Sequence, residues 1–162
     1  MRKTVCMLAL AVAVCVGVWG QSRDFVMDGT TLISYRGIAA NVTIPAGVTA
    51  IGDHAFSLYT GLASVTIPEG VTAIGDFAFA GCGGLTSVTI PASVTRIGDS
   101  AFAYCYNLPR VTIPPNIAYI GFAAFGGCNN LSAVMLHGVI INDRITIGAD
   151  AFPAAARFVY LD

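Results

Sequence analysis

VTIPEGVTAIGDFAFAGCGGLTS, residues 65–87, is the clearest copy of a unit that recurs every 23 residues along this chain. The copy before it, VTIPAGVTAIGDHAFSLYTGLAS, occupies residues 42–64. The two that follow are VTIPASVTRIGDSAFAYCYNLPR at 88–110 and VTIPPNIAYIGFAAFGGCNNLSA at 111–133, and an irregular fifth copy begins at Val134. Repetition at a fixed short period is typical of a solenoid, in which one coil buries its apolar face only by stacking on its neighbours.

Within one unit, the order of apolar and polar residues predicts a short strand followed by a compact return path. Val65 and Ile67 alternate with Thr66, as in a strand with one buried face. Pro68 ends the strand because proline cannot donate to a strand ladder. Asp76 stands where a helical turn needs an N-cap acceptor, so we expect short helical or 3-10 turns on the return path.

Stacking of such units aligns equivalent residues in columns about 4.8 Å apart, which is the spacing of neighbouring strands. A buried phenylalanine removes on the order of 150–250 Å² of surface from water, so one column of phenylalanines is expected to make a major part of the core. Small buried thiols are expected beside that column. The predicted structural core residues are Phe56, Phe79, Phe102 and Phe125, with Cys82, Cys105 and Cys128.

The recurrence of VTIP, IG and AF at fixed offsets resembles the BspA-like class of bacterial leucine-rich repeats, from Val42 to the C-terminus. The resemblance departs in the fifth copy, where HGVIINDRITIG carries four extra residues and Ala155 stands in place of the expected cysteine. We expect an α/β repeat solenoid over residues 42–162, with units starting at 42, 65, 88, 111 and 134. This right-handed coil would carry a parallel β-sheet on one face and the short helical turns on the other.

The N-terminus carries the pattern of a secretory signal peptide. Arg2 and Lys3 precede an apolar run from Val5 to Trp19, and polar residues follow Gly20. The run is too short for an ordinary transmembrane helix, so we expect residues 1–20 to be removed and the mature chain not to insert into a membrane. Lipidation at Cys15 is an alternative, although a bulky valine stands where a lipobox usually has a small residue, and an uncleaved anchor is another.

Residues 21–41 lie outside the repeat and predict a β-hairpin that caps the first coil. Asp28-Gly29 is a favourable turn, and Phe25, Leu32 and Tyr35 are apolar anchors. A solenoid exposes an apolar end that needs such a cap. At the C-terminal end the sequence predicts a weak cap or none, and therefore an open strand edge available for self-association.

Composition argues against nucleic-acid binding and against attraction to anionic lipid headgroups. Charged residues make up only 10% of the chain, and hydrophobic residues make up 56%. The six basic residues that remain after removal of residues 1–20 face nine acidic ones, which leaves a net charge of −3. Without a basic stripe, neither phosphate nor lipid headgroups have an electrostatic reason to bind.

Residue spacing argues against a metal centre, a cofactor or an enzyme. The repeated cysteines lie 23 apart, unlike any CxxC metal site, although two of them could be bridged in an oxidising compartment. The row Asp53, Asp76 and Asp99 is interrupted by Phe122, so we interpret these residues as caps and not as Ca²⁺ ligands. The two histidines fall at unrelated repeat positions, and no catalytic constellation is visible.

Outward positions carry the remaining functional signal. Aromatic residues and arginine anchor many protein interfaces, and they concentrate in the later units. The candidate partner-binding residues are Tyr104, Tyr106, Arg110, Tyr119, Phe122 and Met135. The alternative is that irregular coils use these large side chains to complete their own packing.

These observations predict an exported, non-catalytic protein-binding module. The resemblance implies an adhesin-like role, with a host, matrix or cell-surface protein as the partner. A periplasmic structural or assembly protein that acts by self-association is the main alternative. An enzyme or small-ligand carrier is the third hypothesis, and a closed apolar pocket would favour it.

Overall fold

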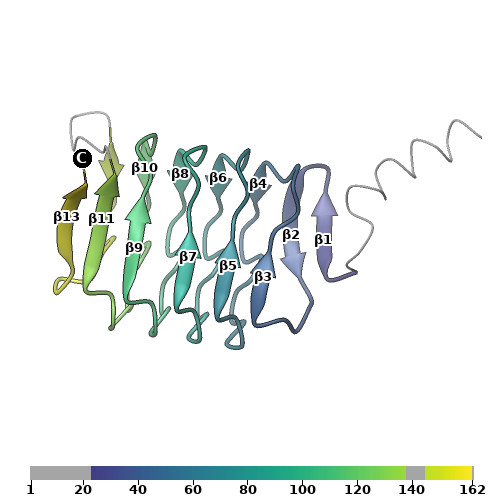
Figure 1. The fold of residues 1–162 in the computed structure, drawn as a ribbon, viewed down its shortest axis with the longest axis horizontal. Coiled ribbons are helices and arrows are strands. Elements are labelled where there is room, and N and C mark those ends of the chain that lie inside the picture. The colour runs from purple at the N-terminus through teal and green to yellow at the C-terminus, as the bar shows by residue number, and fades with distance from the viewer. Residues whose placement is uncertain (1–22, 138–144, 162) are drawn as a thin grey trace, which may run out of the picture.

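The structure, a computed structural model, describes residues 23–137 and 145–161. These residues form an elongated solenoid in which each coil contributes a short strand to each of two faces (Figure 1). The strands of the front face, here called the VTI face, are β3 (Asn41–Thr43), β5 (Ser64–Thr66), β7 (Ser87–Thr89), β9 (Arg110–Ile113), β11 (Ala133–His137) and β13 (Arg157–Leu161).

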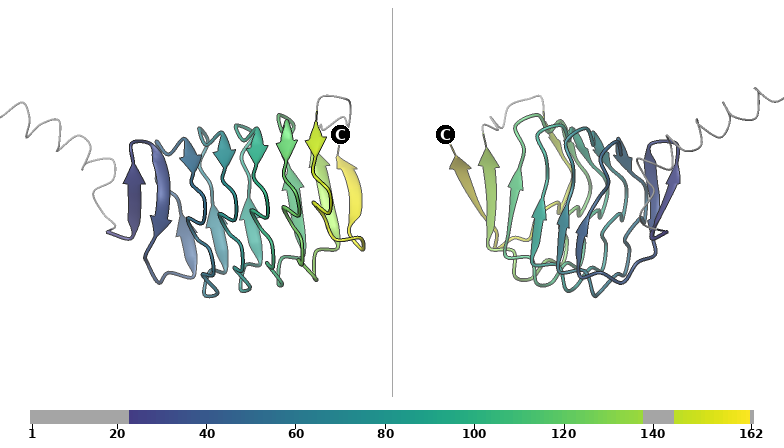
Figure 2. Two further views of the ribbon diagram at one scale, coloured as in Figure 1. Left: turned by 180° about the vertical axis from the view of Figure 1, so that it is seen from behind. Right: turned by 45° about the vertical axis from the view of Figure 1, so that its right-hand side comes forward.

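The second face is a single seven-stranded sheet, which is nearer the viewer in the left view of Figure 2. Its order is β1-β2-β4-β6-β8-β10-β12. The strands are β1 (Phe25–Asp28), β2 (Thr31–Tyr35), β4 (Ala50–Ile51), β6 (Ala73–Ile74), β8 (Arg96–Ile97), β10 (Tyr119–Ile120) and β12 (Thr146–Ile147). Every pairing between coils is parallel, so equivalent residues such as Ile51 and Ile74 lie side by side.

The first coil is covered by the hairpin of β1 and β2, which are antiparallel to each other. β2 then joins the coils by pairing in parallel with β4, where Leu32 lies opposite Ile51. Leu32 is fully buried, and the Tyr35 ring stacks on Phe56 at a centroid distance of 5.1 Å. The hairpin therefore adds Leu32 to the column of buried isoleucines that begins with Ile51, and adds Tyr35 to the column of phenylalanines that begins with Phe56.

The expectation of helical turns opposite the VTI face is wrong for the described residues, which contain no helix. The return path is instead a series of tight turns whose backbone donors alternate between two kinds of acceptor. The N–H groups of Phe56 and Leu58 donate to carbonyls of the next coil, whereas the N–H of Ser57 donates to His54 three residues back. This path contains no helical i→i−4 bonds, because every second backbone N–H donates to a carbonyl of the next coil and not to one in its own turn.

The left-handed backbone of two positions per coil makes this alternation possible. His54 and Leu58 have φ values of 57° and 61°, and Phe77 and Tyr104 repeat the pattern with 55° and 60°. A non-glycine residue in this region costs conformational energy, which is tolerated here because the inter-coil hydrogen bonds require the geometry.

The core is one continuous stack of rings between the two faces. The centroids of Phe56, Phe79, Phe102, Phe125 and Phe152 follow one another at 4.8–5.2 Å, with nearly parallel planes. Phe79, Phe102 and Phe125 are fully buried. This spacing matches the distance between neighbouring strands, so each coil adds one ring to the stack.

Cys82, Cys105 and Cys128 lie next to the stack as free, buried thiols. Each thiol donates a hydrogen bond to the carbonyl of a phenylalanine in the preceding coil; for Cys128 the acceptor is Phe102, at 3.0 Å. These are therefore reduced, hydrogen-bonded core groups in this structure, without a bridge between any two of the three.

Burial predicts that these thiols resist alkylation in the native protein. Burial raises the pKa of the Cys82 thiol to about 12, so at pH 8 almost none of it is the reactive thiolate. All three side chains are fully buried and out of reach of the reagent, so we expect iodoacetamide at pH 8 to leave Cys82, Cys105 and Cys128 unmodified in buffer and to modify all three in concentrated urea. Peptide mass mapping measures this, and rapid native labelling of Cys82 would contradict the buried column.

Candidate interaction surfaces

The six residues predicted to bind a partner lie in three separate places. Arg110 and Met135 lie on the VTI face, in β9 and β11. Tyr119 is in β10 of the seven-stranded sheet, with Phe122 just after it, and Tyr104 and Tyr106 are in the turns that link the two faces. The structure therefore does not bring the six together in one patch.

Tyr104 covers a glycine of the next coil, which gives its exposed ring a packing role. A Cβ added at Gly127 would lie 2.6 Å from the Tyr104 ring, and one added at Gly81 would lie 2.7 Å from the Leu58 side chain. The column 58, 81, 104, 127 thus alternates a large residue with glycine. This alternation is visible in the sequence and was missed. Tyr106 lies over Gly83 in a similar way, and a Cβ added at Gly83 would lie 3.4 Å from a Tyr106 ring carbon.

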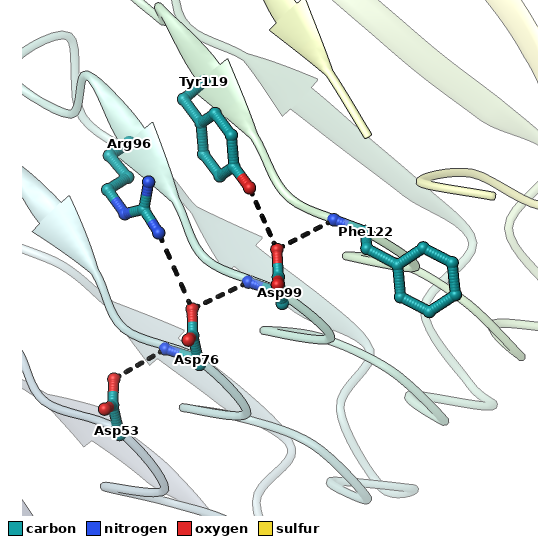
Figure 3. Close-up of polar contacts among 6 residues, drawn as sticks. All are labelled: Asp53, Asp76, Arg96, Asp99, Tyr119 and Phe122. Carbon is teal, nitrogen blue, oxygen red and sulfur yellow. Dashed lines mark hydrogen bonds and ion pairs between the residues drawn. The ribbon is translucent and has the colours of Figure 1, made fainter. Parts of the chain in front are cut away.

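Tyr119 belongs to a polar network on the seven-stranded sheet (Figure 3). Its ring lies beneath the Arg96 guanidinium, 4.2 Å from the ring centroid, and its hydroxyl donates to Asp99 at 3.1 Å. Arg96 also approaches Asp76 at 3.9 Å, in an exposed ion pair. Sequence reasoning did not single out Arg96, although Arg96 and Tyr119 occupy the same repeat position in adjacent units.

The aspartates of this network form a ladder between coils, so their interpretation as helix caps is wrong. Asp53 accepts the N–H of Asp76 at 2.8 Å, Asp76 accepts that of Asp99 at 2.9 Å, and Asp99 accepts that of Phe122 at 2.9 Å (Figure 3). Each carboxylate thus satisfies a backbone donor one coil further on. Phe122 has no carboxylate to continue the ladder, and its exposed ring lies at the end.

The hydrogen bond between Tyr119 and Asp99 predicts a measurable change in phenol ionisation. The Asp99 carboxylate, followed by burial, raises the pKa of Tyr119 above its ordinary value, because ionisation would lose the donated hydrogen bond and place two negative charges together. We expect Asp99→Ala to lower the pKa of Tyr119 towards the ordinary value. NMR of the Tyr119 ring carbons against pH measures the shift, with Asp53→Ala as the matched control that leaves it unchanged.

Arg110 borders an open cleft of about 340 Å³ on the VTI face. The cleft lies where this face divides into two three-stranded sheets, β3-β5-β7 and β9-β11-β13. Its lining residues are Thr86, Ser87, Val88, Pro109, Arg110 and Thr112. Hydroxyls and one guanidinium surround an apolar floor, which is a surface suited to binding a side chain.

A second hollow, of about 390 Å³, opens at the C-terminal coil beside Phe152 and Phe158. Among residues 23–137 and 145–161, no three His, Cys, Asp or Glu residues are grouped as a metal site. No helix in this described part is long and apolar enough to cross a membrane. The predicted signal peptide and most of the fifth-copy insertion lie outside the described residues.

The described residues thus form a parallel β-solenoid with one short strand per coil on each face, a fold shared with solved leucine-rich-repeat proteins. The chain belongs to the BspA type of leucine-rich repeat, which it matches in six copies over residues 35–155. The predicted resemblance is thereby confirmed. Proteins of this family are typically non-catalytic and surface-associated or secreted, and leucine-rich repeats generally mediate protein–protein interactions.

Solved structures of bacterial proteins share this fold. The leucine-rich repeat protein TpLRR of T. pallidum superposes with a TM-score of 0.69 at 22% identity, over 86% of this chain and 63% of its own. The pneumococcal vaccine antigen PcpA gives 0.69 at 20% identity, over 85% of this chain and 40% of its own. A leucine-rich cell surface protein of Faecalibacterium prausnitzii gives 0.58 at 26% identity, over 87% of this chain and 52% of its own. No curated protein sequence matches the chain.

Proposed function

We propose that this chain is an exported, non-catalytic module that binds a protein on a host cell, in a matrix or on another cell through its VTI face. The observation that carries the proposal is this face itself, an exposed sheet surface interrupted by a cleft beside Arg110. The family supports a protein-interaction role, and a similar structure is described as a cell surface protein. The signal-peptide pattern of residues 1–20 supports export.

Site-specific photocrosslinking tests the face and the function together. A benzoylphenylalanine replaces Thr66 on the VTI face, or Thr72 near the seven-stranded sheet as a matched exposed control. The labelled protein is illuminated on intact producing cells and on purified matrix proteins. We expect protein adducts from position 66 and not from position 72. A lack of adducts from both positions contradicts the proposal.

Export is tested on the producing cells. Protease added outside intact cells should degrade the protein if it is on the surface, whereas a periplasmic protein becomes accessible only after the outer membrane is opened. Recovery of the whole protein from the cytoplasmic fraction, with residues 1–20 still attached, contradicts export.

Self-association is a second candidate, favoured by the exposed apolar side chains of β13. Phe158, Val159 and Tyr160 are all at least 40% exposed on a strand that pairs with β11 on one side only. An unpaired strand edge with apolar side chains is a template for pairing with another chain. Sedimentation velocity across a hundredfold concentration range tests it. A constant monomer mass argues against self-association and leaves the protein-binding role intact.

A further inference from the structure

The opening between β7 and β9 coincides with a proline. At the boundaries β3–β5, β5–β7 and β9–β11, the residue just before the VTI strand donates its N–H to the equivalent carbonyl of the preceding coil, whereas between β11 and β13 it is the next residue, Arg157, that donates to Ser132 at 2.9 Å. Ala63 donates to Ala40 at 2.7 Å, Thr86 to Ala63 at 2.9 Å and Ser132 to Pro109 at 3.0 Å. Pro109 holds the same position and has no N–H, so it cannot donate to Thr86. This inter-coil bond is therefore missing here, and β7 and β9 belong to separate sheets.

The break exposes part of the core. Of the five valines in the inward column, Val42, Val65, Val111 and Val134 are at most 4% exposed, whereas Val88 is only partly buried. Val88 lines the cleft beside Thr86 and Ser87, and Pro109, Arg110 and Thr112 line its other side. The cleft thus combines an apolar floor with a cationic rim.

The cleft is too narrow for an inserted strand. On the opposite face β8 and β10 remain hydrogen-bonded, and the rings of Phe102 and Phe125 are 5.1 Å apart across the same boundary. An inserted strand would need about twice the spacing of neighbouring strands, or roughly 9.6 Å. The cleft therefore has room for a side chain and not for a main chain.

The charged residues on this part of the VTI face are arginines. Arg110 is exposed, and the one ion pair recorded within the described residues joins Arg96 to Asp76 elsewhere. Arg157 lies in the same outward column, two strands from Arg110 and separated from it by Ala133. None of the six strands of this face contains an acidic residue. Two arginines thus lie on strands that carry no carboxylate.

We propose that the cleft binds a glutamate side chain from an extended acidic segment of the partner protein. This inference rests on the proposed function and names the partner's chemistry. The two methylenes of the glutamate contact Val88 and Pro109, and its carboxylate accepts hydrogen bonds from the Arg110 guanidinium. A second glutamate three residues on pairs with Arg157. Three residues of polyproline II span about 9.3 Å and two strand steps span about 9.6 Å, so the spacings agree.

NMR titration with a designed peptide tests this inference. The probe is Pro-Pro-Glu-Pro-Pro-Glu-Pro-Pro with blocked ends, added to the ¹⁵N-labelled full chain at 20 mM NaCl. We expect amide shifts at Ser87, Val88 and Arg110, and smaller shifts at Arg157. The same peptide with glutamine in place of glutamate should bind at least tenfold more weakly, and 200 mM NaCl should weaken the glutamate peptide several-fold.

Two variants separate binding from folding. Arg110→Ala should weaken the glutamate peptide about tenfold, whereas Arg36→Ala, at an exposed arginine outside the VTI strands, should change nothing. Pro109→Ser restores a backbone donor, and its hydroxyl matches that of Ser132, which donates to Pro109 at 3.1 Å. It should close the cleft and abolish binding while the thermal midpoint stays the same or rises.

Three results of these experiments would overturn the inference. It fails if the glutamine peptide binds equally well, if Arg36→Ala weakens binding as much as Arg110→Ala, or if the shifts fall on Tyr104 and Tyr106 instead. A failed peptide titration together with crosslinked adducts from position 66 rejects the glutamate site and leaves the proposed function standing. Specific peptide binding without any protein adduct supports the site and counts against the broader proposal.

Discussion

Phe102→Ala is expected to lower the free energy of unfolding by about 3–5 kcal/mol, the range for removing a fully buried phenylalanine. Phe102 stacks between Phe79 and Phe125 at 5.0 and 5.1 Å, and none of its surface is exposed. Removing the ring leaves a cavity between two others. The coils cannot readily close it, because the seven-stranded sheet holds all three coils at the spacing of neighbouring strands and the VTI face also holds the coils of Phe79 and Phe102 together.

Urea denaturation followed by circular dichroism measures this loss. Phe77→Ala is the matched control, because Phe77 is 41% exposed and its ring stacks only on His54 at 5.1 Å. We expect the control to lose about 1 kcal/mol or less. Equal losses for the two variants would show that the ring stack does not dominate the core.

Gly98→Ala is expected to destabilise the fold by about 2–3 kcal/mol through overpacking. The repeated glycine of the IG motif lies against the backbone of the preceding coil, and a Cβ at Gly98 would lie 2.7 Å from both the nitrogen of Asp76 and the carbonyl carbon of Gly75. The chain cannot retreat, because the Gly98 N–H donates to Ile74 at 2.8 Å. Close approach of coils, and not a positive φ, explains glycine here.

Gly83→Ala controls for the general cost of adding a methyl group to this protein. A Cβ at Gly83 would have one neighbour, a Tyr106 ring carbon at an ordinary 3.4 Å, and its φ is not in the left-handed region. We expect its thermal midpoint to stay close to that of the parent, whereas that of Gly98→Ala falls by several degrees. A small effect at Gly98 would mean that the coils separate more easily than their hydrogen bonds indicate.

The repeat made the solenoid predictable, because each apolar position recurs at the same offset and only stacking buries them all. The helical turns were predicted wrongly for a physical reason. A local pattern such as Asp76 before Ala-Phe is equally compatible with an N-cap and with an acceptor for the next coil. The choice depends on neighbouring coils, since Asp76 accepts the N–H of Asp99, 23 residues away.

The candidate surfaces were harder to predict. The repeat pattern shows which residues point outward, but it does not show which of the two faces each of them lies on. Arg110 and Tyr119 are nine residues apart in sequence and yet belong to opposite sheets. Pro109 was a readable signal, as a proline at a position where Ala63, Thr86 and Ser132 all donate. Arg157 could not be placed, because the fifth copy returns to the VTI face after 24 residues and not 23.

Hydrogen bonds, rings and carboxylates all connect a coil to its immediate neighbours, and this has a consequence for how such a chain can lengthen. An in-frame duplication of one complete 23-residue unit would add one coil, and with it one residue to every column of side chains. The molecule would become longer by about 4.8 Å. The stacked phenylalanine contacts of the core would recur at the new boundary, so size can grow by tandem duplication without redesign of the interior.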